Sequence, residues 1–165
     1  MPRWPRDNDR GFTLAEVLLA SLVLMIAILV VAAMFPTGYR AVTDAGRMTQ
    51  GVTAARQILE DIGSLPFTSV ANLNNYDTTN VGTVPAADPE RAAARRWRYM
   101  LAGAGSGFTF TAAEQTAWGA PPTFGGRAVV TVANTSATLR TVTVTVSVPG
   151  LSPTIQVSTV VVGLF

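Results

Sequence analysis

Residues 11–35, which read GFTLAEVLLASLVLMIAILVVAAMF, decide how the rest of the chain is organised. Residues 17–35 carry no charge, and Ser21 is the only polar side chain among these 19 residues. At 1.5 Å per residue, a helix of this length spans about 28 Å, close to the roughly 30 Å thickness of a bilayer's hydrocarbon core. Because only a helix satisfies its own backbone in lipid, the sequence predicts a membrane-spanning helix here.

Glu16 stands at the edge of this apolar run. A carboxylate at such a position costs a few kcal/mol, and an acid kept there is a candidate functional residue. Residues 17–35 offer no cation to pair with it. Proteolysis after Gly11 would create one, because the new amino terminus on Phe12 would lie four residues from Glu16.

The run RGFTLAE, residues 10–16, followed by the long apolar segment, resembles the N-terminus of a type IV prepilin with a class III signal. The resemblance implies that a membrane-bound prepilin peptidase cuts after Gly11 and methylates Phe12. It also implies that Glu16 pairs with the N-terminal amine of a neighbouring subunit. The partners to expect are other pilin or pseudopilin subunits, the prepilin peptidase, an inner-membrane assembly platform and membrane lipid.

Two other interpretations of the segment are open. An ordinary secretory signal peptide would place Val31 and Ala33 as the small residues before the cut. A plain signal anchor would make Glu16 incidental. The apolar run is longer than the usual core of a signal peptide and has Glu16 at its start, so we prefer the prepilin interpretation.

The prepilin interpretation divides the chain into a leader, residues 1–11, a transmembrane and assembly helix, residues 12–36, and a globular domain, residues 37–165. Three arginines flank the apolar run on its N-terminal side, so the positive-inside rule predicts a single-pass inner-membrane protein with its N-terminus inside and its C-terminus outside. After assembly, the globular domain would lie in a periplasmic or cell-surface filament.

The amino-acid composition and net charge exclude several classes of function. The 165 residues include neither cysteine nor histidine, which excludes disulfides, thiol nucleophiles, Ser-His-Asp triads and zinc sites built from these ligands. The sequence contains no nucleophile–base pair, metal-ligand set or phosphate-binding loop, so we expect neither enzymatic activity nor a cofactor. Beyond Gly11 there are 9 basic and 8 acidic residues, a net charge of +1, which argues against bulk electrostatic capture of nucleic acid.

An amphipathic helix over residues 37–63 should follow the membrane segment. Pro36 predicts a kink or local melting near residues 32–36, and Gly63 and Pro66 end the helix. Gly46 and Gly51 should each weaken it by about 1 kcal/mol. Its apolar and small residues recur at helical spacing and predict the face that packs on the rest of the domain: Val42, Ala45, Thr49, Val52, Ala55, Leu59 and Ile62.

Residues 67–85 predict a loop, within which Asn72, Asn74, Asn75 and Asp77 gather oxygen atoms. A single carboxylate without EF-hand spacing favours turns over a calcium site. Residues 103–126 predict a further connection, with a short strand at Phe108 and Phe110.

A second helix is predicted over residues 89–101, because Asp88, Pro89 and Glu90 supply a cap, a first-turn proline and a first-turn acid. Trp97 and Leu101 should anchor it against the sheet. This helix also carries a set of arginines beside aromatic residues that could contact DNA, although a solvated basic face is commoner: Arg91, Arg95, Arg96 and Arg98.

Period-two patterns predict strands over residues 127–133, 139–148 and 154–162. In the second of these, Val142, Val144, Val146 and Val148 face one side and threonines and Ser147 the other. The amphipathic helix is the natural cover for the valines, so we expect an α+β fold in which a long N-terminal helix packs on a small antiparallel sheet, as in type IV pilins.

Together these features predict a structural subunit, a minor pilin or pseudopilin of a type IV pilus or a type II secretion pseudopilus. The run ILEDI, residues 58–62, resembles modification-type minor pilins and I-type pseudopilins. The alternative is a pilin-like module that binds DNA or a surface ligand.

Overall fold

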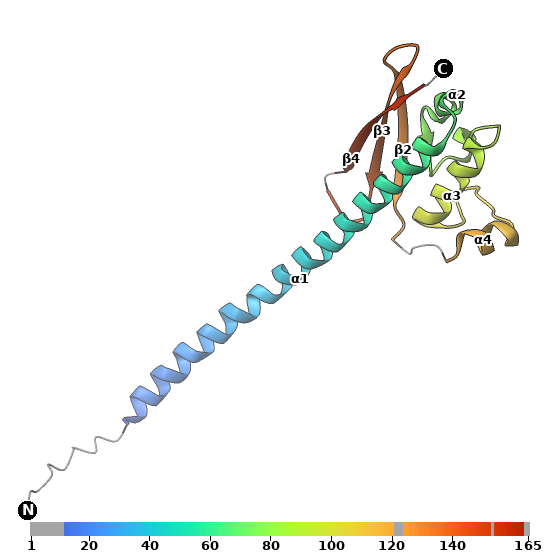
Figure 1. Ribbon diagram of the computed structural model, residues 1–165. Helices are drawn as coiled ribbons and strands as arrows, with labels where there is room; N and C mark the ends of the chain where they lie inside the picture. Colours follow the sequence, from blue (N-terminus) through green and yellow to red (C-terminus); the bar gives the residue numbers. More distant parts are fainter. Residues whose placement is uncertain (1–11, 121–123, 153, 164–165) are drawn as a thin grey trace, which may run out of the picture. The chain divides into compact units, whose positions relative to one another are not determined.

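The computed structural model describes residues 12–120, 124–152 and 154–163 (Figure 1). The chain divides into two compact units, Met1–Val42 and Thr43–Phe165. The leader, including Gly11, lies outside the described residues.

Helix α1, Leu14–Ser64, contains the apolar residues 17–35 of the first unit and supplies one layer of the second. The helix continues without interruption through Pro36, so the local melting predicted there does not occur. A proline removes a single N–H, and the hydrogen bonds of the neighbouring turns suffice to keep the helix intact.

The second unit contains a four-stranded sheet in the order β1-β2-β3-β4. The strands are β1, Tyr76–Asp77, β2, Arg127–Asn134, β3, Leu139–Ser147, and β4, Ile155–Val162. Every neighbouring pair is antiparallel. The three longer strands confirm the prediction, and the two-residue β1 was missed because it is too short to show a periodic pattern.

The segment predicted as the loop 67–85 is more structured than expected. It holds the short helix α2, Phe67–Val70, the 3-10 turns Ala71–Leu73 and Val81–Thr83, and strand β1. Val70, Leu73 and Tyr76 are fully buried, so this segment forms one wall of the core.

The valine face of β3 lies at the centre of the core, as predicted. Val142, Val144 and Val146 are fully buried. The last turns of α1 supply Ala54, Ala55, Ile58 and Ile62 to the same cluster. The expectation of an α+β fold, with the long helix packed on an antiparallel sheet, is therefore confirmed.

The helix face that packs on the sheet differs in part from the predicted stripe. Val42, Ala45 and Thr49 are exposed, and the buried positions of α1 are Gly51, Ala54, Ala55, Ile58 and Ile62. The prediction followed helical spacing from Val42, although the packing begins only at Gly51. Spacing alone does not reveal where along a helix a partner sheet starts.

Helices α3, Glu90–Ala102, and α4, Ala112–Trp118, complete the second unit. The first confirms the predicted second helix, and its Trp97 and Leu101 are fully buried. The second was not predicted, although Thr111 and Glu114 form a reciprocal capping box that the sequence displays as Thr-x-x-Glu. Residues 103–126 are therefore more than a connection.

Gly51 allows α1 to approach the sheet closely. A Cβ added at this position would overlap Ile155 Cδ1 and would lie 3.0 Å from Val148 Cγ2. A Cβ at Gly46 would meet nothing within 4 Å. The sequence assigned both glycines the same destabilising effect, whereas the structure gives only Gly51 a packing role.

We predict opposite effects of alanine at these two glycines. Gly46→Ala should raise the thermal stability, because alanine favours an exposed helix by about 1 kcal/mol over glycine. Gly51→Ala should lower it, because forcing a methyl group into a packed core costs about 1–3 kcal/mol and exceeds that gain. Thermal unfolding of the full chain in detergent micelles, followed by circular dichroism, measures both, and stabilisation by Gly51→Ala would contradict the close packing.

Candidate functional site

The start of α1 is closed by a reciprocal pair of side chains, Thr13 and Glu16. The Glu16 backbone N–H donates to Thr13 Oγ1 at 3.3 Å. In return, Glu16 Oε2 accepts from the Thr13 backbone N–H and from Thr13 Oγ1, both at 2.9 Å. This is a capping box, which satisfies two N–H groups that a helix start would otherwise leave unpaired.

The capping box gives the predicted assembly carboxylate a defined position. Glu16 lies in the first turn of α1, where the helix dipole favours a negative charge. Phe12 is 83% exposed beside it, and Gly11 lies outside the described residues. Within the described part of the chain, no ion pair involves Glu16. Sequence reasoning missed Thr13, although its spacing to Glu16 is the signal of a capping box.

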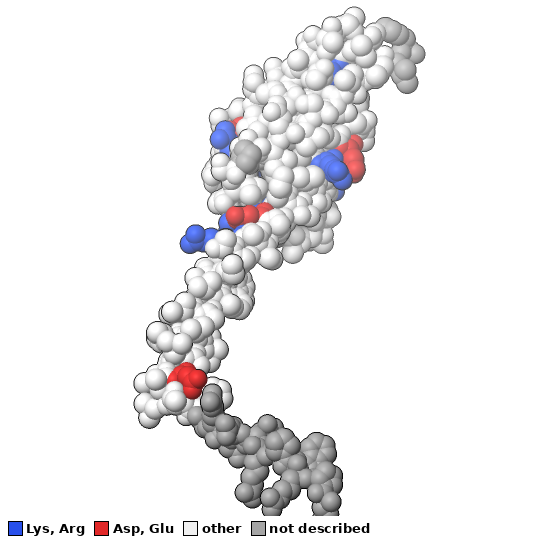
Figure 2. Space-filling model, turned by 90° about the vertical axis from the view of Figure 1, so that its left-hand side faces the viewer, with Lys and Arg blue, Asp and Glu red and all other residues white. Residues whose placement is uncertain are grey.

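The first unit offers an apolar helix surface against which no other described residue packs. Every residue from 17 to 35 is exposed, and Figure 2 shows this part of the helix almost free of charged side chains. Of the helices in the described residues, α1 is the one that is long and apolar enough to cross a membrane. Exposure of such a large apolar surface to water is unfavourable, so lipid or other apolar helices must cover it.

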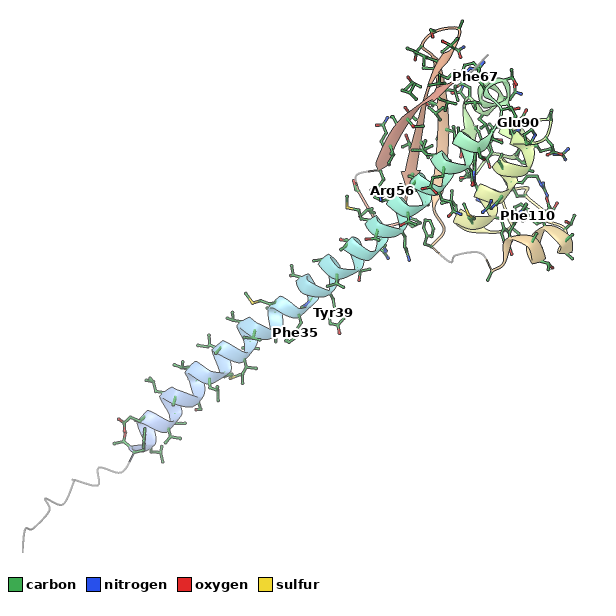
Figure 3. The ribbon with its side chains drawn as sticks, in the orientation of Figure 1. Phe35, Tyr39, Arg56, Phe67, Glu90 and Phe110 are labelled. Carbon is green, nitrogen blue, oxygen red and sulfur yellow. The ribbon has the colours of Figure 1, made fainter. Side chains whose placement is uncertain are left out.

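A shallow apolar recess lies on this helix around Gly38, which carries no side chain. Val31, Met34, Phe35, Tyr39 and Val42 line its other sides. In Figure 3, the labelled rings of Phe35 and Tyr39 project from the same side of the helix. A side chain of a neighbouring apolar helix would fit into a recess of this kind.

The four arginines of α3 do not form one open basic surface. Arg95 binds Glu114 through two hydrogen bonds of 2.8 and 2.9 Å and also donates to Thr109 O at 2.8 Å. Arg96 lies 3.8 Å from Asp61. These two arginines are thus engaged by acids of α4 and α1.

Arg98 is turned inward, with only 5% of its surface exposed. It donates to Gly105 O at 3.3 Å, and its guanidinium lies 5.3 Å from the centre of the Phe108 ring. Arg91 is the exposed member of the set. Three of the four arginines therefore contact other parts of their own domain. The sequence gave no signal that Glu114 and Asp61 would be their partners.

The asparagine-rich segment is also occupied by internal contacts. Asn74 Oδ1 accepts from the Val132 N–H at 3.0 Å, and Asp77 Oδ1 accepts from Arg127 Nε at 3.0 Å. Asn72 donates to Glu90 Oε1 at 2.7 Å and thereby lowers the pKa of the Glu90 carboxyl. The described residues contain no group of three or more acidic side chains placed to hold a metal ion.

Comparison with known proteins identifies the N-terminal segment. Residues 6–32 match the model of a family described as the prokaryotic N-terminal methylation motif. The match covers Phe12, Thr13 and Glu16 together with most of the apolar helix surface. No curated protein and no solved structure matches the chain.

The Arg95–Glu114 pair predicts an acid sensitivity of the α3–α4 region. Hydrogen bonds from Arg95 lower the pKa of Glu114 from 4.5 to about 2. A depressed carboxyl pKa stabilises the fold above its unfolded-state value, and this stabilisation disappears as the pH falls from about 4.5 towards 2. The Glu114→Gln variant should therefore have a free energy of unfolding about 1 kcal/mol lower than the parent at pH 7, a modest loss because the pair is partly exposed. Its stability should also fall less than that of the parent as the pH is lowered.

Thermal unfolding of the full chain in micelles between pH 7 and pH 2.5 measures this difference. Glu60→Gln, at an exposed acid of α1, is the matched control and should follow the parent curve. An unchanged pH profile of Glu114→Gln would show that the pair does not stabilise the domain.

Proposed function

We propose that this chain, a type IV pilin-like prepilin by its N-terminal methylation motif and its fold, is a structural subunit that is cut after Gly11 and assembles through α1 into a filament. In this proposal residues 1–11 are the leader, residues 12–36 the membrane and assembly helix, and residues 37–165 the exterior domain. The precursor is a single-pass inner-membrane protein with its N-terminus inside.

The observation that carries the proposal is a carboxylate placed just before an apolar helical segment, residues 17–35, that is exposed along its whole length. Glu16 is held by Thr13 within its own chain, and residues 17–35 have no packing partner among the described residues. An acid at the edge of a membrane segment is costly unless it is hydrogen-bonded or paired with a cation. Thr13 supplies hydrogen bonds, and processing supplies the cation.

The proposed chemistry of assembly follows from this arrangement. Cleavage after Gly11 turns the Phe12 amide nitrogen into an amine, which stays cationic when methylated. The amine of one subunit and the Glu16 carboxylate of its neighbour would then neutralise one another in an apolar setting, where an unpaired charge is most costly. Such a pair would also fix the axial offset between adjacent helices.

The alternative, a DNA-binding module, has weaker support. It rests on the arginines of α3, of which Arg95, Arg96 and Arg98 contact residues of their own domain. The ILEDI run, residues 58–62, does not distinguish a pilus from a secretion pseudopilus, because three of its residues pack or bond within the domain core. Ile58 and Ile62 are fully buried, and Asp61 Oδ2 accepts from Trp97 Nε1 at 2.8 Å.

We predict that the mature chain begins with a methylated Phe12. Intact-mass measurement of the protein from membranes should give the mass of residues 12–165 plus one methyl group when prepilin peptidase is present. Without the peptidase, the full precursor mass should appear. A mature chain that begins at Met34 would instead indicate an ordinary signal peptidase and would contradict the proposal.

We also predict that Glu16→Gln blocks incorporation into filaments and leaves membrane insertion and cleavage largely intact. The amide keeps the shape of the side chain and removes its charge, so the change isolates the ion pair from packing. The measurement compares this protein in the sheared-filament fraction with that in the membrane fraction.

The matched control is Glu60→Gln, which makes the same change at an exposed acid on the same helix. It should enter filaments as the parent does. Equal recovery of Glu16→Gln and the parent in filaments would show that Glu16 is not the assembly contact. Loss of the Glu16→Gln protein from membranes would assign the residue a role in insertion instead.

A further inference from the structure

Two hollows adjoin beside helix α3. The first, of about 480 Å³, lies between α3 and α4, and Arg91 and Glu114 are among its lining residues. The second, of about 290 Å³, lies between α3 and the end of α1, and its lining residues include Asp61 and Arg96. Ala92 lines both, so the two hollows form one groove, the α3 groove, within the second unit. The larger hollow alone has the size of small-molecule sites, roughly 300–1,000 Å³.

The charged residues of the α3 groove balance one another. Three arginines and three acids line it: Arg91, Arg95, Arg96, Asp61, Asp88 and Glu114. A densely charged polyanion such as DNA would meet the three carboxylates together with the arginines, so the groove is unsuited to it. Mixed signs suit a ligand that presents carboxylates and hydroxyl groups side by side, because guanidinium groups bind the first and carboxylates accept hydrogen bonds from the second.

The arginine donors of the groove are largely unused within the domain. The Arg91 side chain has no hydrogen bond or ion pair among the described residues. Arg96 lies 3.8 Å from Asp61, too far for a hydrogen bond. Glu114 binds Nε and Nη2 of Arg95 and holds this guanidinium in place, whereas its Nη1 has no described partner. The groove therefore presents spare donors, one of them already fixed in position for a ligand.

Two aspartates supply hydrogen-bond acceptors. Asp88 Oδ1 accepts from the Ala92 N–H at 3.2 Å, and its Oδ2 has no partner in the part of the chain that the structure describes. Asp61 Oδ2 accepts from Trp97 Nε1 at 2.8 Å, while Oδ1 lies 3.8 Å from Arg96. Each aspartate is thus held through one oxygen and offers the other to a ligand.

Phe110 and Trp118 give the groove an aromatic ring in each hollow. Both are partly exposed, and Figure 3 labels Phe110 at the junction of α3 and α4. Their rings pack edge to face with 5.7 Å between centres, and both contact the buried Tyr99 ring. Packing therefore fixes two aromatic rings beside polar groups. This arrangement suits a sugar, because an aromatic ring covers the C–H face of a pyranose while polar neighbours bind its hydroxyl groups.

We propose that the α3 groove binds a linear polysaccharide that contains uronic acids. The arginines bind the sugar carboxylates, the two aspartates accept from the hydroxyl groups, and the two aromatic rings cover the C–H faces of the sugar rings. Two adjoining hollows suit neighbouring units of one chain better than a single sugar. The exterior location of the groove, where such polymers occur, rests on the proposed function, but the binding itself does not depend on Gly11 cleavage or on Glu16.

The test measures binding of a fluorescently labelled hexamer of galacturonic acid. The full chain, in micelles of a detergent without a sugar headgroup, is titrated into the labelled hexamer and binding is followed by fluorescence anisotropy. We expect saturable binding by the parent protein. No saturable binding would overturn the proposal.

Arg91→Ala should weaken this binding at least about tenfold, which is the effect of losing a hydrogen-bonded contact to a charged group. Arg91 is exposed, so the fold should be unaffected. The matched control is Arg56→Ala, which removes the same charge from an exposed arginine of α1 that does not line the groove. It should bind as the parent does. Equal affinities of the two variants would show that the groove is not the binding site.

Two unlabelled competitors test the ligand class. Maltohexaose has six sugar rings without carboxylates, and hexaglutamate has six side-chain carboxylates without sugar rings. Each should displace the probe at least about tenfold less well than unlabelled hexagalacturonic acid, because each offers only part of the contacts. Equal competition by maltohexaose would remove the role of the arginines, and equal competition by hexaglutamate would assign the groove to an acidic peptide. Either result would overturn the proposal.

Asp88→Asn separates recognition of hydroxyl groups from simple attraction of charge. The amide keeps an oxygen that can accept from the Ala92 N–H and removes one negative charge. Loss of the acceptor should weaken binding about threefold or more. Unchanged or tighter binding would show that charge alone attracts the ligand and would contradict the sugar assignment. Because the assay needs no filament, a negative result here leaves the proposed assembly intact, and failed assembly leaves the measured affinity intact.

Discussion

The burial of the β3 valines under the last turns of α1 is the contact on which the rest of the structure depends. Val142, Val144 and Val146 are fully buried, and Ala55, Ile58 and Ile62 of the helix share their cluster. The small residues Gly51, Ala54 and Ala55 let the helix lie close to the sheet. Because the same helix carries the membrane segment, one continuous element links the domain core to the proposed assembly surface.

The two parts of α1 satisfy opposite requirements. Residues 17–35 expose an apolar surface that needs lipid or neighbouring helices, whereas the turns from Gly51 onward bury their apolar face inside their own domain. The polar groups of the helix start are satisfied internally by Thr13 and Glu16. Under the proposed function, the precursor would hold the carboxylate hydrogen-bonded to Thr13 until processing provides an amine.

Arginines bridge several elements of the domain, which contains no cysteine. Arg95 joins α3 to α4, Arg96 lies beside Asp61 of α1, and Arg127 pairs with Asp77 across β1 and β2. Arg140 lies over the Phe67 ring, with 4.2 Å from its guanidinium carbon to the ring centre. Hydrogen-bonded arginine pairs with carboxylates are among the stronger polar contacts in proteins. These arginines thus contact other elements of their own domain and do not form an open surface for nucleic acid.

The sequence by itself determined the membrane helix, the second helix, the three longer strands and the α+β class, because each depends on a periodic pattern or a local start signal. The N-terminal motif could also be recognised from the sequence, because its residues Phe12, Thr13 and Glu16 are neighbours along the chain. Only the tertiary structure decided which turns of α1 meet the sheet, that Gly51 is a packing residue while Gly46 is not, and that Arg95, Arg96 and Arg98 face their own domain. These features depend on partners 19, 35 and 104 positions away, as in Arg95–Glu114, Asp61–Arg96 and Gly51–Ile155. Periodicity describes one segment at a time, and the pairing of distant segments is fixed by packing in three dimensions.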